Sequence, residues 1–264
     1  MRKGKTVKLS VLICLALLQT GCKLTFLGRT EIDQIDFIRV VGIDKSAEKE
    51  DHVRLTIATQ KIQAEISGGG SKKQSSIVVS EGETVFDAVR NFWSYMDNRP
   101  FWGHIGYTLI GEEAAKDGIM KYIDFFCRDP EVRLNMEIFQ TKGTTAEEVI
   151  IKATGENRFI FEQLEGITEN QSGQSVINVV NLVEVMYILD KGYLSLYIPC
   201  LEIQQKTYPD MQNDAMDIAM GGFALFEGDK LVAHLNADMG RGLNWLKNKV
   251  ESGVIVVKSP KGNS

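Results

Sequence analysis

Two periodicities alternate along this chain, and together they restrict its fold more than any other feature of the sequence. Several segments alternate apolar and polar residues, which is typical of half-buried strands, and residues 35–43 are evenly apolar, as in a central strand. Other segments repeat apolar residues at steps of three and four, the pattern of amphipathic helices. Strands are expected at 35–43, 53–57, 134–138, 194–200, 218–226 and 231–235, and helices at 85–96, 119–126, from 145 onward, 179–189 and 238–249. This order predicts an α+β fold with mixed sheets and packed helices.

The expected domain boundary is a polar stretch in the last third of the chain. Residues 205–214 include Pro209 and read as a linker between an N-terminal α+β domain at 33–204 and a second one at 215–264. The second unit offers one hairpin, one helix and a lone strand at 254–257, which is a thin core. We therefore expect at least two domains, the last of them incomplete.

The N-terminus has the pattern of a secretory signal. Basic residues precede an apolar run at 9–18, which is too short for a comfortable bilayer crossing. Small residues then precede Cys22, as in bacterial lipoprotein processing, although Gln19 occupies the position where Leu is usual. The sequence predicts a signal peptide at 1–21, lipidation of Cys22 and a post-anchor linker at 22–32. A signal cut elsewhere, or an uncleaved anchor, is the alternative.

The charge of the chain restricts its partners. The formal net charge is −5, and removal of the signal, which carries four basic residues and no acidic ones, would leave about −9. Nucleic-acid binding requires clustered Lys and Arg, so nucleic acid is not expected as a partner. Tight electrostatic adhesion to anionic lipid is disfavoured for the same reason, and membrane attachment would need the lipid anchor.

No motif in the sequence indicates catalysis, a cofactor or a metal. The chain lacks a Gly-x-Ser-x-Gly elbow, and the glycine-rich loop at 67–73 lacks phosphate-loop spacing. Acidic residues 112–113 fit a helix start better than a catalytic pair. Cys127 and Cys200 are either two buried free thiols, which we favour, or a disulfide. The three histidines are scattered without metal-ligand spacing: His52, His104 and His234.

Two short segments supply candidate partner-interface residues. An aromatic cluster contains Trp93 and Trp102 and reads either as a ligand pocket or as a partner surface, because Trp is enriched at protein interfaces. Half of this cluster is expected to belong to the core. The charged turn that follows the helix at 119–126 contains Arg128 and Asp129, which read either as a solvated turn with local ion pairs or as part of a binding site. These four side chains are the predicted interface.

Segments along nearly the whole exported chain resemble one family. The segments are EIDQIDFIRVVGID at 31–44, HIGYTLIGEEAAKDGI at 104–119, FFCRDPEVRLN at 125–135, KGTTAEEV at 142–149, GGFALFEGDKLV at 221–232 and GLNWL at 242–246. In this order they resemble the C-subunit lipoproteins of spore germinant receptors, the Ger(x)C family.

The resemblance implies a non-catalytic, multidomain α+β lipoprotein held by a palmitate-bearing anchor on the outer face of the spore inner membrane. It would work beside a membrane-embedded A subunit and an integral membrane B subunit when nutrients trigger germination. Family members usually continue into a further α+β domain, so a C-terminally truncated member is expected. The alternatives are an exported solute-binding lipoprotein that captures a small nutrient itself, and a structural lipoprotein of the cell envelope.

Overall fold

A computed structural model describes residues 34–64, 71–155, 158–170, 178–204, 216–250 and 252–253. It confirms the α+β fold class. Five predicted features lie outside the described residues: the signal peptide, Cys22, the post-anchor linker at 22–32, the linker at 205–214 and the strand at 254–257.

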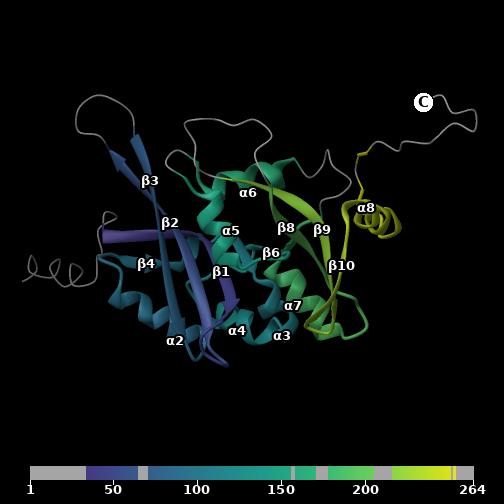
Figure 1. The fold of residues 1–264 in the computed structure, drawn as a ribbon, viewed down its shortest axis with the longest axis horizontal. Coiled ribbons are helices and arrows are strands. Elements are labelled where there is room, and N and C mark those ends of the chain that lie inside the picture. Colours follow the sequence, from purple (N-terminus) through teal and green to yellow (C-terminus); the bar gives the residue numbers. More distant parts are fainter. Residues whose placement is uncertain are drawn as a thin grey trace, which may run out of the picture. The chain divides into compact units, whose positions relative to one another are not determined.

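The described strands form one mixed sheet (Figure 1). Their order is β10-β9-β8-β6-β5-β1-β2-β3, with β4 paired to β1 and β7 paired to β6. The strands are β1 (Ile35–Lys45), β2 (Val53–Ala64), β3 (Ser71–Gly82), β4 (Arg99–Phe101), β5 (Tyr107–Ile110), β6 (Glu137–Thr141), β7 (Val180–Asn181), β8 (Tyr197–Gln204), β9 (Asp217–Glu227) and β10 (Lys230–Leu235).

The centre of the sheet is parallel and its flanks are antiparallel. Strands β1, β5, β6 and β8 run parallel, whereas the β2–β3 and β9–β10 hairpins are antiparallel. Strand β1 is central, as its even apolar pattern predicts, because a parallel strand is covered on both faces. The strand predicted at 134–138 was wrong in position. It spans Glu137–Thr141 instead, and Leu134 lies in the preceding turn with 42% of its surface exposed.

The hairpin predicted for a second domain extends the same sheet. Strand β9 pairs with β8 from Tyr197 opposite Leu225 to Gln204 opposite Asp217. A bulge in β9 places Gly222 at a φ of 101°, with the β10 backbone so close that a side chain there would meet the carbonyl of Leu235. The structure thus shows no separate sheet within residues 216–250, and the boundary at 205–214 stays a prediction.

Helices cover both faces of the sheet. The core on one face is built with α2, α3, α4 and α7, and the core on the other with α5 and α6. Helix α8 lies beside β9 and β10 (Figure 1). The helices are α2 (Val85–Asn91), α3 (Glu112–Asp117), α4 (Met120–Arg128), α5 (Ala146–Ala153), α6 (Ile160–Glu169), α7 (Leu182–Lys191) and α8 (Ala237–Leu246).

Local sequence signals explain most of these helix boundaries. Thr84 and Thr145 accept hydrogen bonds from backbone N–H groups three residues on and so begin α2 and α5. Helix α6 was not predicted.

Cys127 and Cys200 are both free thiols, as we favoured from the sequence. Cys200 is fully buried as expected, whereas Cys127 is only partly buried.

Candidate functional site

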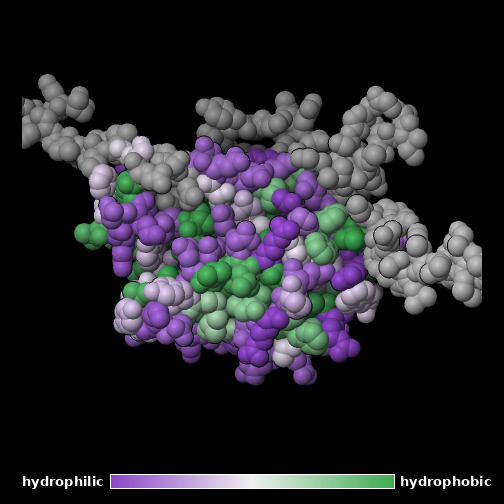
Figure 2. All heavy atoms as spheres, turned by 180° about the vertical axis from the view of Figure 1, so that it is seen from behind, coloured by the Kyte–Doolittle hydropathy of each residue, from purple (hydrophilic) through white to green (hydrophobic). Residues whose placement is uncertain are grey.

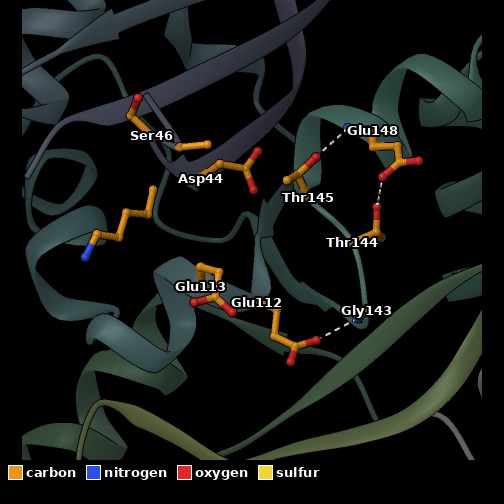
Figure 3. Close-up of a pocket in the computed structure, with 10 residues that line it drawn as sticks. Asp44, Ser46, Glu112, Glu113, Gly143, Thr144, Thr145 and Glu148 are labelled. Atoms are coloured by element: carbon orange, nitrogen blue, oxygen red, sulfur yellow. Dashed lines mark hydrogen bonds between the residues drawn. The ribbon is translucent and has the colours of Figure 1, made fainter. Parts of the chain in front are cut away.

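A polar cavity lies where three central strands end. Its volume is about 580 Å³, within the range of small-molecule sites. It sits at the carboxyl ends of β1, β5 and β6, the edge where ligands bind in sheets with parallel strands. Figure 3 shows side chains from these strand ends and from the starts of α3 and α5. The lining residues are Asp44, Lys45, Ser46, Ala47, Glu112, Glu113, Gly143, Thr144, Thr145 and Glu148.

Asp44 ties the end of β1 to the start of α5. Its Oδ1 accepts a hydrogen bond from the N–H of Ala146 at 2.8 Å, and its Oδ2 accepts one from Glu147 at 2.9 Å. These are orphan donors of the first helical turn, so the chain's own carboxylate occupies the anion site that a helix start provides. These two N–H groups are therefore not available to bind a phosphate in the cavity.

The approach of Asp44 requires a glycine opposite. A Cβ atom at Gly111 would lie 1.9 Å from Asp44 Oδ1, a separation that no side chain tolerates. Gly111 follows β5 and immediately precedes α3, so this glycine permits the carboxylate, the strand end and both helix starts to meet.

Burial controls the titration of Asp44. The side chain is 3% exposed, and desolvation raises the pKa of its carboxyl to about 6, against the two backbone hydrogen bonds that lower it. Asp44 is thus ionised at neutral pH but close to protonation.

The other acidic side chains of the cavity are matched by cations. Glu112 accepts a hydrogen bond from the N–H of Gly143 at 2.6 Å and pairs with Lys116 at 2.8 Å, and the Lys116 hydrogen bond lowers its pKa. Glu148 pairs with Lys152 and accepts a hydrogen bond from the Thr144 hydroxyl.

Beside the cavity, Arg54 donates hydrogen bonds to two acids from different elements. Its Nε lies 2.5 Å from Glu147 on α5, and its Nη1 lies 2.9 Å from Glu81 on β3. The rim is therefore cross-linked by ion pairs, and its carboxylate and hydroxyl oxygens can accept hydrogen bonds from a small polar ligand. Within the described ranges, no group of three or more His, Cys, Asp and Glu side chains is placed to hold a metal ion.

A second hollow, the α2–α4 groove, contains two of the predicted interface residues. It measures about 530 Å³ and includes Arg128 and Asp129. The exposed Phe86 of α2 packs on Phe125 of α4, with ring centroids 6.0 Å apart. Arg128 pairs with Asp124 at 2.9 Å and stays 78% exposed, as expected of a solvated turn with local ion pairs. The groove is thus an aromatic contact rimmed by charges.

The two predicted tryptophans occupy different environments. Trp102 is 5% exposed, and its ring packs on Phe92 and Phe126, so the prediction that it lies on an interface surface is corrected: it belongs to the core. Trp93 is 60% exposed and is not among the residues that line either hollow.

Two residues of these hollows were not predicted from the sequence, Asp44 and Phe86. An acidic residue directly at the end of a central strand was the signal for Asp44.

Two family models match the chain in succession. Residues 28–203 match the model described as spore germination protein N-terminal domain, and residues 221–264 match the one described as spore germination B3/GerAC like, C-terminal. No solved structure matches the chain significantly. In the part of the chain that the structure describes, no helix has the length and hydrophobicity needed to cross a membrane.

Two curated relatives come from Bacillus subtilis strain 168. The putative spore germination protein YfkR is 25% identical over 85% of this chain and 56% of its own length. Spore germination protein KC is 24% identical over 84% of this chain and 58% of its own length. The chain thus spans somewhat more than half the length of these relatives.

The Asp44→Asn variant should change how stability depends on pH. Because the folded pKa of Asp44 is raised above its unfolded value, its contribution is fully present below about pH 4 and is lost as the pH rises through about 6. Relative to the variant, the wild type should lose on the order of 2 kcal/mol of unfolding free energy between about pH 4 and 7. Urea unfolding across this range measures the difference.

Asp190→Asn, which removes a carboxylate that is 79% exposed, controls for the change in net charge. If the free energy of unfolding changed with pH by the same amount in the wild type and in Asp44→Asn across the whole range, the assignment of a raised pKa to Asp44 would be contradicted.

Proposed function

Because the chain belongs to the family of spore germination proteins that share this N-terminal domain, we propose that it is the lipid-anchored C subunit of a germinant receptor. The observation that carries the proposal is the match of both family models, in order, over residues 28–203 and 221–264. The subunit acts without catalysis, on the outer face of the spore inner membrane, beside the membrane-embedded A subunit and the integral membrane B subunit.

The anchor in this proposal is a lipid on Cys22. The formal charge of about −9 without residues 1–21 opposes attachment by surface charge, so the lipid must hold the chain. One acyl chain binds a bilayer only weakly, whereas the diacylglyceryl group together with an N-acyl chain such as palmitate gives stable attachment.

The α2–α4 groove is the proposed contact with the membrane subunits. Phe86 leaves 56% of its surface exposed, and Arg128 stands at the rim of the same groove. Aromatic and Arg side chains dominate the energy of many protein interfaces. Figure 2 shows that hydrophobic side chains also gather in a patch on one otherwise largely hydrophilic face, which is typical of a surface that binds partners.

Docking gives a non-catalytic subunit a means to act. A bound subunit shifts the equilibrium between two receptor states only if it binds one state more tightly than the other. In this proposal, the chain helps assemble the receptor and biases its response to nutrients.

Cys22→Ala should release the protein from membranes. The wild type is expected in the membrane fraction with lipid detectable at Cys22 by mass spectrometry, and the variant in the soluble fraction, since the thiol that carries the lipid is gone. Globomycin, which blocks lipoprotein signal cleavage, should make the wild type accumulate in its unprocessed form. Equal membrane retention of both proteins, with no lipid on either, would end the lipoprotein proposal.

A double change in the groove, Phe86→Ser with Arg128→Ala, should reduce co-purification of the A and B subunits. The tagged chain is isolated from detergent-solubilised spore membranes, and both subunits are quantified by immunoblot. Val232→Ser is the matched control, because Val232 is as exposed as Phe86 but lies on the edge strand β10. Unchanged recovery with the groove variant would remove the groove from the interface.

The second candidate is a solute-binding lipoprotein, and the cavity at the strand ends is the observation that favours it. A thermal-shift screen with amino acids and sugars separates the two functions, because a ligand that binds the folded state raises the melting temperature. The receptor-subunit proposal expects no shift. A shift that Glu112→Gln abolishes and Asp190→Asn retains would promote direct ligand capture in the cavity.

A further inference from the structure

Two large aromatic side chains lie exposed at the end of α2. The short 3₁₀-helix η3 (Phe92–Ser94) continues from α2, and in it Phe92 is fully buried. Its neighbour Trp93 is 60% exposed, and Tyr95, which ends η3, is 66% exposed. The buried Phe92 therefore fixes a turn that presents an indole and a phenol ring to the outside.

This turn is fastened to the start of the central strand. Three residues after Tyr95, the side-chain amide of Asn98 donates a hydrogen bond to Asp36 Oδ1 at 3.0 Å. The following strand β4 pairs with β1, as Figure 1 shows, and the rings of Phe101 and Phe37 pack edge to face with centroids 5.8 Å apart. The exposed aromatic pair thus belongs to the same end of the fold at which β1 begins.

The chain from Cys22 arrives at this end. Twelve residues separate Cys22 from Ile35, so even a fully extended connection spans only about 40 Å. A lipid on Cys22 would therefore keep the start of β1 within about 40 Å of the bilayer, so the turn fastened to this strand can reach the headgroup region. Trp and Tyr favour the headgroup level of a membrane, where the ring is buried and the polar edge stays hydrated.

We propose that Trp93 and Tyr95 form a membrane-contact surface that rests in the lipid headgroup region when the chain is anchored through Cys22. This inference rests on the lipid anchor of the proposed function. The contact depends on aromatic rings rather than basic clusters, in keeping with the acidic character of the chain. The lipid and the aromatic contact attach the domain to the bilayer at two points. Two attachments restrict the orientation of the domain, whereas a single flexible connection would not.

Tryptophan quenching by brominated lipid tests the contact. The full-length lipidated chain is reconstituted into phosphatidylethanolamine and phosphatidylglycerol vesicles with or without brominated acyl chains. We expect the brominated lipid to quench the wild type, and Trp93→Phe to lose that quenching while keeping an aromatic ring. Quenching should persist from about 0.1 M to about 1 M KCl, because salt screens only charge interactions.

Trp245→Phe is the matched control. Trp245 is 49% exposed, but it lies on α8 beside β9 and β10, at the other end of the sheet order from the β1–β2–β3 side. This variant should keep the quenching. Quenching that survives Trp93→Phe would overturn the contact.

Mass spectrometry of the same sample separates the two proposals. A chain that carries lipid at Cys22 but shows no quenching of Trp93 overturns the membrane contact alone. A chain without lipid at Cys22 overturns the anchor and the contact together. Protection of Trp93 in spore membranes containing the A and B subunits, but not in pure lipid, also overturns the lipid contact and assigns the aromatic pair to a protein partner.

Discussion

The carboxylate of Asp44 joins the end of the central strand to the first turn of α5, and the cavity forms around this junction. Two hydrogen bonds from Ala146 and Glu147 hold it there, and Gly111 leaves it the necessary space. Without the carboxylate of Asp44, the N–H groups of Ala146 and Glu147 would lack an acceptor. A side chain at position 111 would displace the carboxylate and leave its buried charge without these donors. Both changes cost free energy, because unsatisfied polar groups are unfavourable in a low-dielectric interior. The same carboxylate fills the anion site of α5, so the N–H groups of Ala146 and Glu147 are not available to a phosphate.

The surfaces proposed for binding occupy different parts of one helical layer. The α2–α4 groove exposes Phe86 and Arg128, whereas the turn after α2 exposes Trp93 and Tyr95 next to the start of β1. A lipid-anchored subunit must face both a bilayer and its membrane partners. The arrangement gives each contact its own residues, and a fixed orientation on the bilayer would present the groove in a constant direction.

Several sequence expectations depended on local pattern alone, and those were the most accurate. The helix starts at Thr84 and Thr145 follow from side chains that bond the next turn, and the central position of β1 follows from its apolar run. Other expectations were wrong. The alternation at 134–138 did not locate the strand, which spans Glu137–Thr141. Trp102 was assigned to a surface, yet contacts with Phe92 and Phe126, which no local pattern shows, place it in the core.

The sequence by itself determined the α+β class, the main helix starts and the family, because periodicity, caps and ordered motifs are properties of neighbouring residues. Only the tertiary structure decided where the cavity lies and which aromatic rings are exposed. Asp44 meets Ala146 across 102 positions of the chain, and Trp93 becomes part of the β1 end only because β4 pairs with that strand. Contacts between residues so far apart leave no local pattern, since the packing of strands and helices creates them.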